Sequence, residues 1–222
     1  MRARELRPTL PKPAPAGSAI AFDPTEKVFE AGDGSVVQVG KDYMKHIRES
    51  DISGLVWMQP QATVRAFELR AGEEVVGTLQ WSNRFGSLAD AVAAEGHWTL
   101  KRTGFFNPRI SVRACGWDTD LALFIPQWTA DGVLEFASGQ RLLWSGSGFW
   151  RSRWSFKSAS GERLVDFEPC DSLFKKSASV KVTPTGLAMA ELSLLVLLGW
   201  YLMLLRSDDD AAVVASVTCA IG

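Results

Sequence analysis

The sequence predicts a mainly β fold: a closed antiparallel barrel with a hydrophobic C-terminal helix buried in its bore. Between residues 54 and 182, short runs carry apolar side chains at every second position, which is typical of half-buried strands. An almost uncharged run follows at 187–205. A helix that is apolar all round must be covered on every side, and the bore of a closed barrel provides that cover. Turn-forming pairs separate the strand-like runs: Asn107-Pro108, Asp131-Gly132, Ser138-Gly139 and Ser160-Gly161.

Composition limits the class of protein. The 222 residues suit one ordinary domain or two small ones. With 46% hydrophobic and 22% charged residues, the chain can bury a core. Lys and Arg number 24 against 25 Asp and Glu, giving a formal net charge of −1. Because nucleic-acid binding relies on a basic field, we expect no nucleic-acid partner.

Residues 1–20 predict a flexible arm, because they are basic and interrupted by prolines. No apolar stretch follows the arginines, so we expect no secretory signal peptide and a cytoplasmic protein. The cysteines Cys115, Cys170 and Cys219 lie far apart in the sequence. They indicate buried or inert thiols in a reducing compartment rather than a disulfide framework.

The elements follow in chain order from this arm. A strand-like run covers 35–39, after a turn at Asp33-Gly34, and a short polar helix is expected near 43–49. The Ala-rich stretch 87–95 fits either a short helix or a loosely paired strand. The other expected strands are centred on apolar residues that alternate with polar ones: Phe67 and Leu69, Leu79 and Trp81, Trp98 and Leu100, Ile110 and Val112, Leu134 and Phe136, Trp150, Trp154 and Phe156, and Val165 and Phe167.

Two interpretations of the C-terminal apolar run compete. As a membrane span, the 19 residues 187–205 are barely long enough and contain Glu191, which is costly in lipid. The 14 uncharged residues 192–205 cover about 21 Å as a helix, which favours a helix buried in protein, with Glu191 at the mouth of the bore. The residues expected to contact the strands are Leu192, Leu194, Leu195, Leu198, Trp200 and Leu202.

Three segments result from this interpretation. They are the arm at 1–20, a barrel over 21–206 that includes the central helix 187–205, and a tail at 207–222. Arg206 and the triplet Asp208-Asp209-Asp210 are expected to end the helix, because aspartates mark a solvated break. No role follows from the sequence for the second apolar stretch, Ala211 to Ile221.

The layout of many short strands followed by one very apolar helix resembles the tubby-like superfamily, which includes tubby C-terminal domains, LURP-one-related proteins and phospholipid scramblases. The similarity extends over about residues 20–205, and no counterpart matches the tail. It implies a barrel of roughly twelve strands around the central helix. It rests on three segments: Trp98-Thr99-Leu100-Lys101-Arg102 with Gly104-Phe105-Phe106, the hairpin from Trp150 to Phe167, and Glu191-Leu192-Ser193-Leu194-Leu195 through Trp200-Tyr201.

Strand alternation indicates which cations face outward. Arg109 and Arg113 alternate with apolar neighbours on one strand, and so do their counterparts near Trp154 on another. Tubby domains bind phosphoinositide headgroups through a basic patch, so the resemblance implies binding of an anionic membrane lipid. The alternative is a solvated outer face with acidic residues interspersed. The candidate residues are Arg109, Arg113, Arg151, Arg153, Lys157, Lys175 and Lys176.

No motif indicates catalysis, a metal or a cofactor. His46 and His97 are the only histidines, and His97 is expected to be a surface histidine at the start of a strand. Ser145-Gly146-Ser147-Gly148 lacks the spacing of a nucleophile elbow. The acidic clusters at 118–120 and 208–210 lack the pattern of a calcium loop. We therefore expect a non-enzymatic protein without catalytic residues.

The function expected from these features is that of a monomeric, non-enzymatic tubby-like barrel, acting as a peripheral anionic-lipid-binding or adaptor module. One alternative is an integral, scramblase-like membrane protein with a single span at 187–205. A second alternative is a small ligand-binding barrel or a hydrolase without a recognised motif.

Overall fold

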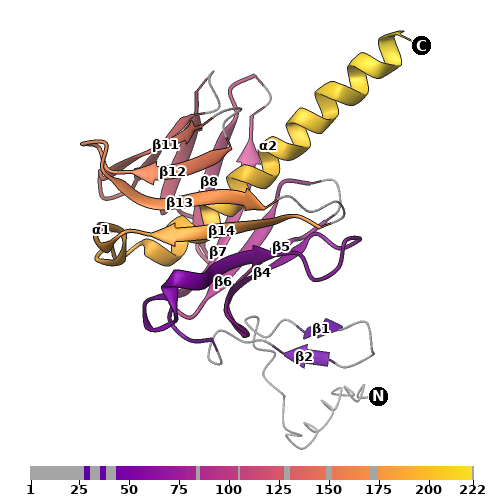
Figure 1. Cartoon of the computed structure of the whole chain (residues 1–222). Coiled ribbons are helices and arrows are strands. Elements are labelled where there is room, and N and C mark those ends of the chain that lie inside the picture. The colour runs from indigo at the N-terminus through magenta and orange to yellow at the C-terminus, as the bar shows by residue number, and fades with distance from the viewer. Residues whose placement is uncertain are drawn as a thin grey trace, which may run out of the picture. The chain divides into compact units, whose positions relative to one another are not determined.

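The structure is a computed structural model that describes residues 28–30, 36–38, 44–83, 86–104, 106–127, 131–148, 152–170 and 175–221 (Figure 1). The chain divides into two compact units, 1–38 and 39–222. In the first unit, β1 (Val28–Glu30) pairs antiparallel with β2 (Val36–Gln38). The strand expected at 35–39 thus corresponds to β2. The predicted arm at 1–20 lies outside the described residues.

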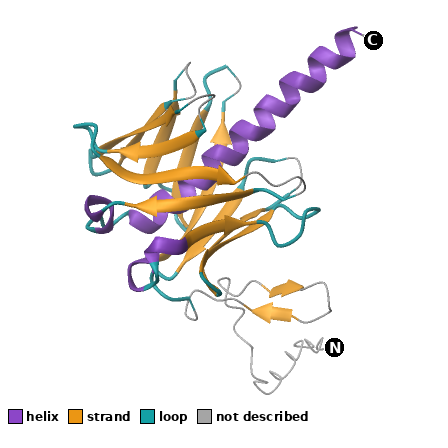
Figure 2. Ribbon diagram, viewed as in Figure 1, coloured by secondary structure: helices purple, strands orange, loops and turns teal. Residues whose placement is uncertain are grey.

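Among the described residues of the second unit, twelve antiparallel strands form a closed barrel (Figure 2). Each strand pairs with the next in the chain, and β14 pairs with β3 to complete the ring. This arrangement confirms the predicted fold class. The strands are β3 (Leu55–Met58), β4 (Ala66–Ala71), β5 (Glu74–Trp81), β6 (Ala89–Ala93), β7 (Gly96–Thr103), β8 (Arg109–Ala114), β9 (Ala122–Pro126), β10 (Gly132–Phe136), β11 (Arg141–Ser147), β12 (Arg153–Lys157), β13 (Arg163–Cys170) and β14 (Ser177–Val182).

The structure defines the secondary structure of two regions for which the sequence provided only an approximate expectation, residues 43–49 and 87–95. The short helix expected near 43–49 is a 3-10 turn, η2 (Ile47–Glu49), and a second one, η3 (Ile52–Gly54), leads into β3. The Ala-rich stretch is the strand β6, with Ala89, Ala91 and Ala93 fully buried toward the bore. Small side chains on this strand allow the central helix to pass close to it.

The central helix begins later than the sequence indicated. A short helix, α1 (Pro184–Leu187), comes first, and α2 runs from Leu192 to Ile221. The chain turns at α1 because Gly186 lies against the carbonyl of Leu164 on β13, where a Cβ atom would overlap that oxygen. Glu191, just before α2, is half-buried.

Strand side chains enclose the first half of α2, as the buried-helix interpretation requires. The residues predicted to contact the strands are all buried: Leu192, Leu194, Leu195, Leu198, Trp200 and Leu202. Trp200 stacks on Trp57 of β3 at 5.9 Å between ring centroids. Gly199 makes room for Phe167 of β13, because a Cβ atom at this position would overlap that aromatic ring.

The prediction that Arg206 and the aspartate triplet end the helix is wrong, because α2 continues through them to Ile221. Asp208 and Asp209 are held by cations of the barrel, and Arg206 lies 3.6 Å from Asp210 one turn along the helix. These ion pairs offset the low helix propensity of aspartate. No helix within the described residues is both long and apolar enough to cross a lipid bilayer.

Replacing the fully buried Leu195 with alanine should lower the free energy of unfolding by about 2–5 kcal/mol, because it leaves a cavity in the bore. The matched change Val213→Ala, at an exposed position on the same helix, should alter it by less than about 0.5 kcal/mol. Urea unfolding measures both. Equal losses in the two variants would contradict the enclosed helix.

Tyr201 should make stability fall at high pH. Its buried hydroxyl donates to the carbonyl of Ser87 at 2.5 Å, and burial raises the pKa of the phenol well above its usual value. In the unfolded chain the phenol ionises near pH 10, so above that pH unfolding releases a proton. The free energy of unfolding then drops by up to about 1.4 kcal/mol per pH unit.

Below pH 9, the wild type should be more stable than Tyr201→Phe by about 1 kcal/mol, the net contribution of one hydrogen bond. Urea unfolding between pH 8 and 11 should show this difference shrinking above pH 10. Parallel stability curves for the two proteins would refute the assignment.

Candidate functional site

The helix leaves the barrel at one end, which we call the exit end. Because each strand pairs with the next, alternate loops lie at the same end of the barrel. The exit end therefore carries the β3–β4, β5–β6, β7–β8, β9–β10, β11–β12 and β13–β14 connections. Figure 1 shows α2 passing beyond the strands on this side.

A group of ion pairs joins α2 to the barrel at the exit end. The Asp208 carboxylate lies 2.5 Å from Nη2 of Arg65 and 3.3 Å from Nζ of Lys176. The two carboxylate oxygens of Asp209 accept hydrogen bonds from Nη1 of Arg102 at 2.9 and 2.7 Å. We call these five residues the collar. They bring together three separate parts of the barrel and fix where the helix emerges.

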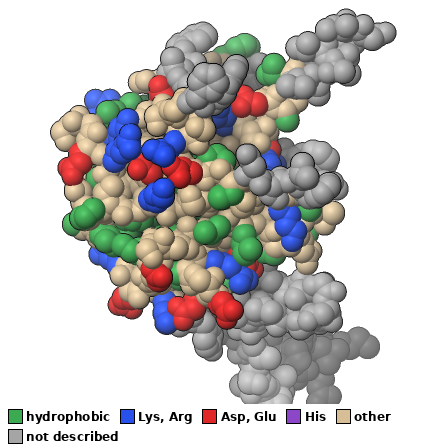
Figure 3. Space-filling model, in the orientation of Figure 1, with side chains coloured by type: hydrophobic (Ala, Val, Ile, Leu, Met, Phe, Trp, Pro, Cys, Tyr) green, Lys and Arg blue, Asp and Glu red, His purple; other side chains and the backbone are tan. Residues whose placement is uncertain are grey.

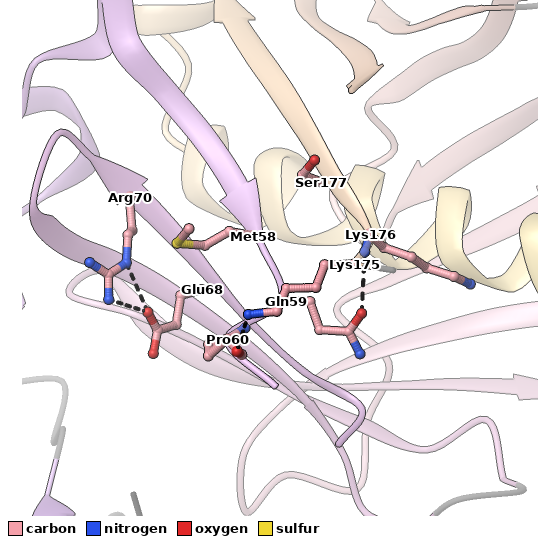
Figure 4. A pocket seen from close by; sticks show the side chains of 8 residues that line it. All are labelled: Met58, Gln59, Pro60, Glu68, Arg70, Lys175, Lys176 and Ser177. Carbon is pink, nitrogen blue, oxygen red and sulfur yellow. Dashed lines mark hydrogen bonds and ion pairs between the residues drawn. The ribbon is translucent and has the colours of Figure 1, made fainter. Parts of the chain in front are cut away.

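Beside the collar lies a pocket of about 440 Å³, lined by Met58, Gln59, Pro60, Glu68, Arg70, Lys175, Lys176 and Ser177 (Figure 4). We call it the lysine pocket. Strand β3 and the loop after it form one wall, β4 supplies Glu68 and Arg70, and the start of β14 with the loop before it supplies the rest.

Hydrogen bonds hold the lysine pocket in shape. The buried Gln59 side chain donates to the carbonyl of Val64 at 2.9 Å and accepts from the backbone N–H of Lys176 at 3.2 Å. Nζ of Lys175 donates to the carbonyl of Pro60 at 2.6 Å. The guanidinium of Arg70 binds Glu68 through two nitrogens, at 2.9 and 2.6 Å. The loop before β14 is thus fastened to the end of β3.

The structure does not gather the predicted cations into one patch. Lys175 and Lys176 share the lysine pocket, whereas Arg109 and Arg113 lie on β8 and Arg153 lies on β12, with three strands between. Lys157 is also on β12, and Arg151 lies outside the described residues.

Acidic neighbours pair with two of these outward-facing arginines. Arg113 Nε lies 2.6 Å from Asp120, whose carboxylate raises the pKa of the guanidinium. Arg153 contacts Glu168, which also lies 3.1 Å from Lys181. The hydrogen bonds from Lys181 and Arg153 lower the pKa of Glu168. On the face seen in Figure 3, blue and red side chains are intermixed in this way.

Both histidines pair with carboxylates. His97 Nε2 lies 3.3 Å from Asp90. The side chain lies on the outer face at the start of β7, where the polar face was expected, and is half-buried with 10% of it exposed. His46 Nδ1 lies 3.5 Å from Glu95. Within the described part of the chain, no group of three His, Cys, Asp or Glu residues is placed to hold a metal ion.

Sequence reasoning missed the aspartates of the collar and Gln59. One signal was present: an acidic triplet that directly follows a bore-filling helix has to pass the barrel rim, where strand ends such as those at Arg65 and Arg102 supply cations. Gln59 carries no comparable signal. No family model, curated protein or solved structure matches this chain.

Removing the charge of Asp208 should weaken the attachment of α2 to the barrel at the exit end and lower the stability of the protein. Asp208→Asn loses two ion pairs to the barrel and should lower the free energy of unfolding by about 1 kcal/mol at low salt. Asp210→Asn is the matched control, because its carboxylate pairs with Arg206 of the same helix; the expected loss is about 0.3–0.5 kcal/mol. Urea unfolding at 0.05 and 1 M salt should show both effects shrinking with salt. A smaller loss for Asp208→Asn than for the control would contradict the collar.

Proposed function

We propose that this chain is a non-enzymatic tubby-like barrel that binds anionic membrane lipid peripherally, through the lysine pocket. The observation that carries the proposal is the meeting of Lys175, Lys176 and Arg70 around one pocket of about 440 Å³. Two of these cations were candidates from the sequence. The third comes from a strand more than a hundred residues earlier in the chain.

The charge and shape of the lysine pocket suit a phosphate-bearing headgroup. Its lining holds three cations and one acid, Glu68, and Lys176 also pairs with Asp208 of the collar, so the formal charge with both acids counted is +1. Ammonium and guanidinium groups form strong, charge-assisted hydrogen bonds to phosphate oxygens. Met58 and Pro60 add apolar contacts beside these donors. The volume lies in the range usual for small-ligand sites.

The filled bore supports a surface site over the other expected functions. An interior ligand site, as in a small ligand-binding barrel, would need the space that Leu195, Leu198 and their neighbours occupy. A membrane anchor at 187–205 would need apolar side chains facing lipid, whereas strand residues already bury 192–205.

Vesicle co-sedimentation tests the proposal. Wild type should bind phosphatidylcholine vesicles that contain phosphatidylserine or a phosphoinositide, and binding should weaken as salt rises from 0.05 to 0.5 M. Lys175→Gln/Lys176→Gln should bind about 30-fold more weakly, at about 1 kcal/mol per lysine. Thermal melting of the double variant verifies that it is folded.

The matched control is Lys101→Gln, at an exposed position on β7, five strands from β14 around the barrel. It should lower binding less than either single change in the pocket, Lys175→Gln or Lys176→Gln. Equal losses in the three single variants would show a diffuse charge effect rather than a site, and absence of wild-type binding at low salt would refute the proposal.

A further inference from the structure

Beyond the collar, α2 continues as an apolar helix outside the barrel. Residues 211–221 include no charged residue. Ala211, Ala212 and Val213 are exposed, and Val213 is 62% accessible to solvent. An uncharged, largely apolar helix outside a core requires a covering surface. From here on, the tail means residues 211–221 alone, the apolar part of the segment 207–222.

Exposed apolar side chains also lie on loops of the exit end. Phe106, in the β7–β8 loop, is 96% exposed. Val64 and Leu88 are exposed in the β3–β4 and β5–β6 loops. Three loops thus each present an apolar side chain at this end. At the opposite end, the large exposed apolar residues of the described chain, Trp117 and Leu121, belong to a single loop.

Cations border the same end. Arg109 begins β8, and the lysine pocket opens beside β14. Arg153, which begins β12, already pairs with Glu168. The acidic triplet is paired: Asp208 and Asp209 contact cations of the collar, and Asp210 contacts Arg206 of the same helix. This pairing reduces its repulsion of an anionic surface. An apolar tip with cations beside it is the pattern of segments that enter the membrane interface.

We propose that the exit end faces the membrane and that the tail enters the apolar layer of the bilayer, with Phe106, Val64 and Leu88 at the interface. This inference rests on the membrane association proposed above and gives it an orientation. The tail residues extend about 16 Å as a helix, so Val213 lies near the headgroups and Cys219 deeper. The ion pairs of the collar hold the helix upright on the barrel.

A lipid surface fits this end better than a second copy of the chain. In a two-fold dimer through the exit end, the same surface meets itself, so Arg109 and the cations of the lysine pocket face the same end of the other copy. Juxtaposed like charges oppose such a contact. An anionic leaflet complements the same cations.

The native cysteines give three reporter positions for a test. Cys219 lies in the tail, and Cys170 ends β13 at the exit end. Cys115 follows β8 at the opposite end. Cys115 and Cys170 are exposed, which allows labelling. Of the buried or inert thiols expected from the sequence, burial does not hold for these two. Each of three single-cysteine proteins, with the other two changed to serine, is labelled with the environment-sensitive fluorophore NBD.

On vesicles of phosphatidylcholine and phosphatidylserine, NBD at Cys219 should shift to the blue and be quenched by nitroxides on the acyl chains. NBD at Cys115 should not change, and NBD at Cys170 should respond less than at Cys219. Val213→Asp should abolish the Cys219 response and lower the salt-resistant part of binding at least tenfold. Trp117→Asp, at a 69% exposed position of the opposite end, is the matched control and should leave both unchanged.

The outcomes separate this inference from the proposed function. Co-sedimentation without a response at Cys219 would overturn the inserted tail and leave lipid binding intact. A response at Cys115 would overturn the orientation. A dimer mass by light scattering, lost in Val213→Asp, would show that a second copy covers the tail. A Cys219 response that survives Lys175→Gln/Lys176→Gln would support the tail and refute the pocket, and absence of wild-type binding to any vesicle would refute both.

Discussion

The absence of a polar face on the first half of α2 is the constraint on which the rest of the structure depends. Four consecutive residues, Leu194, Leu195, Val196 and Leu197, are all buried, although they point in different directions around the helix. Only a surrounding layer can cover all of them, and the closed ring of strands supplies it. The bore is filled unevenly. Small residues such as Ala91 line β6, whereas aromatic rings from β11 to β13 cover another side of the helix.

Because α2 fills the bore, a binding site on this barrel has to lie on its outer face or at one of its two ends. At the exit end the helix must pass from an apolar interior to solvent within about one turn, and charged residues make that transition. Arg65 shows how tightly this region is built, because its guanidinium both pairs with Asp208 and lies 4.4 Å from the centre of the Trp81 ring. These contacts hold the cations of the exit end in fixed positions before a ligand binds, which reduces the conformational entropy lost on binding.

Local pattern predicted the barrel well and its contacts poorly. Alternation placed Phe67, Leu100 and Phe167 in the core correctly, because strand period depends only on neighbouring residues. The continuation of α2 past the aspartate triplet was not predicted, because it involves the ion pair between Asp208 and Arg65, which are 143 positions apart in the sequence. Alternation also gave the outward direction of Arg153 but not Glu168 beside it on the next strand, since sequence pattern does not fix which strands pair.

Lys176 belongs to both the collar and the lysine pocket, so the two are physically linked. Lys176 lines the cavity in which we place a phosphate, and its ammonium lies 3.3 Å from Asp208. A phosphate bound there adds negative charge close to Asp208, and the ammonium must divide its three donors between two anions. If the proposed function holds, binding in the pocket would therefore change the strength with which α2 is held at the exit. Because coupling between two equilibria is reciprocal, a tail fixed in a bilayer would then alter the affinity of the pocket by the same factor.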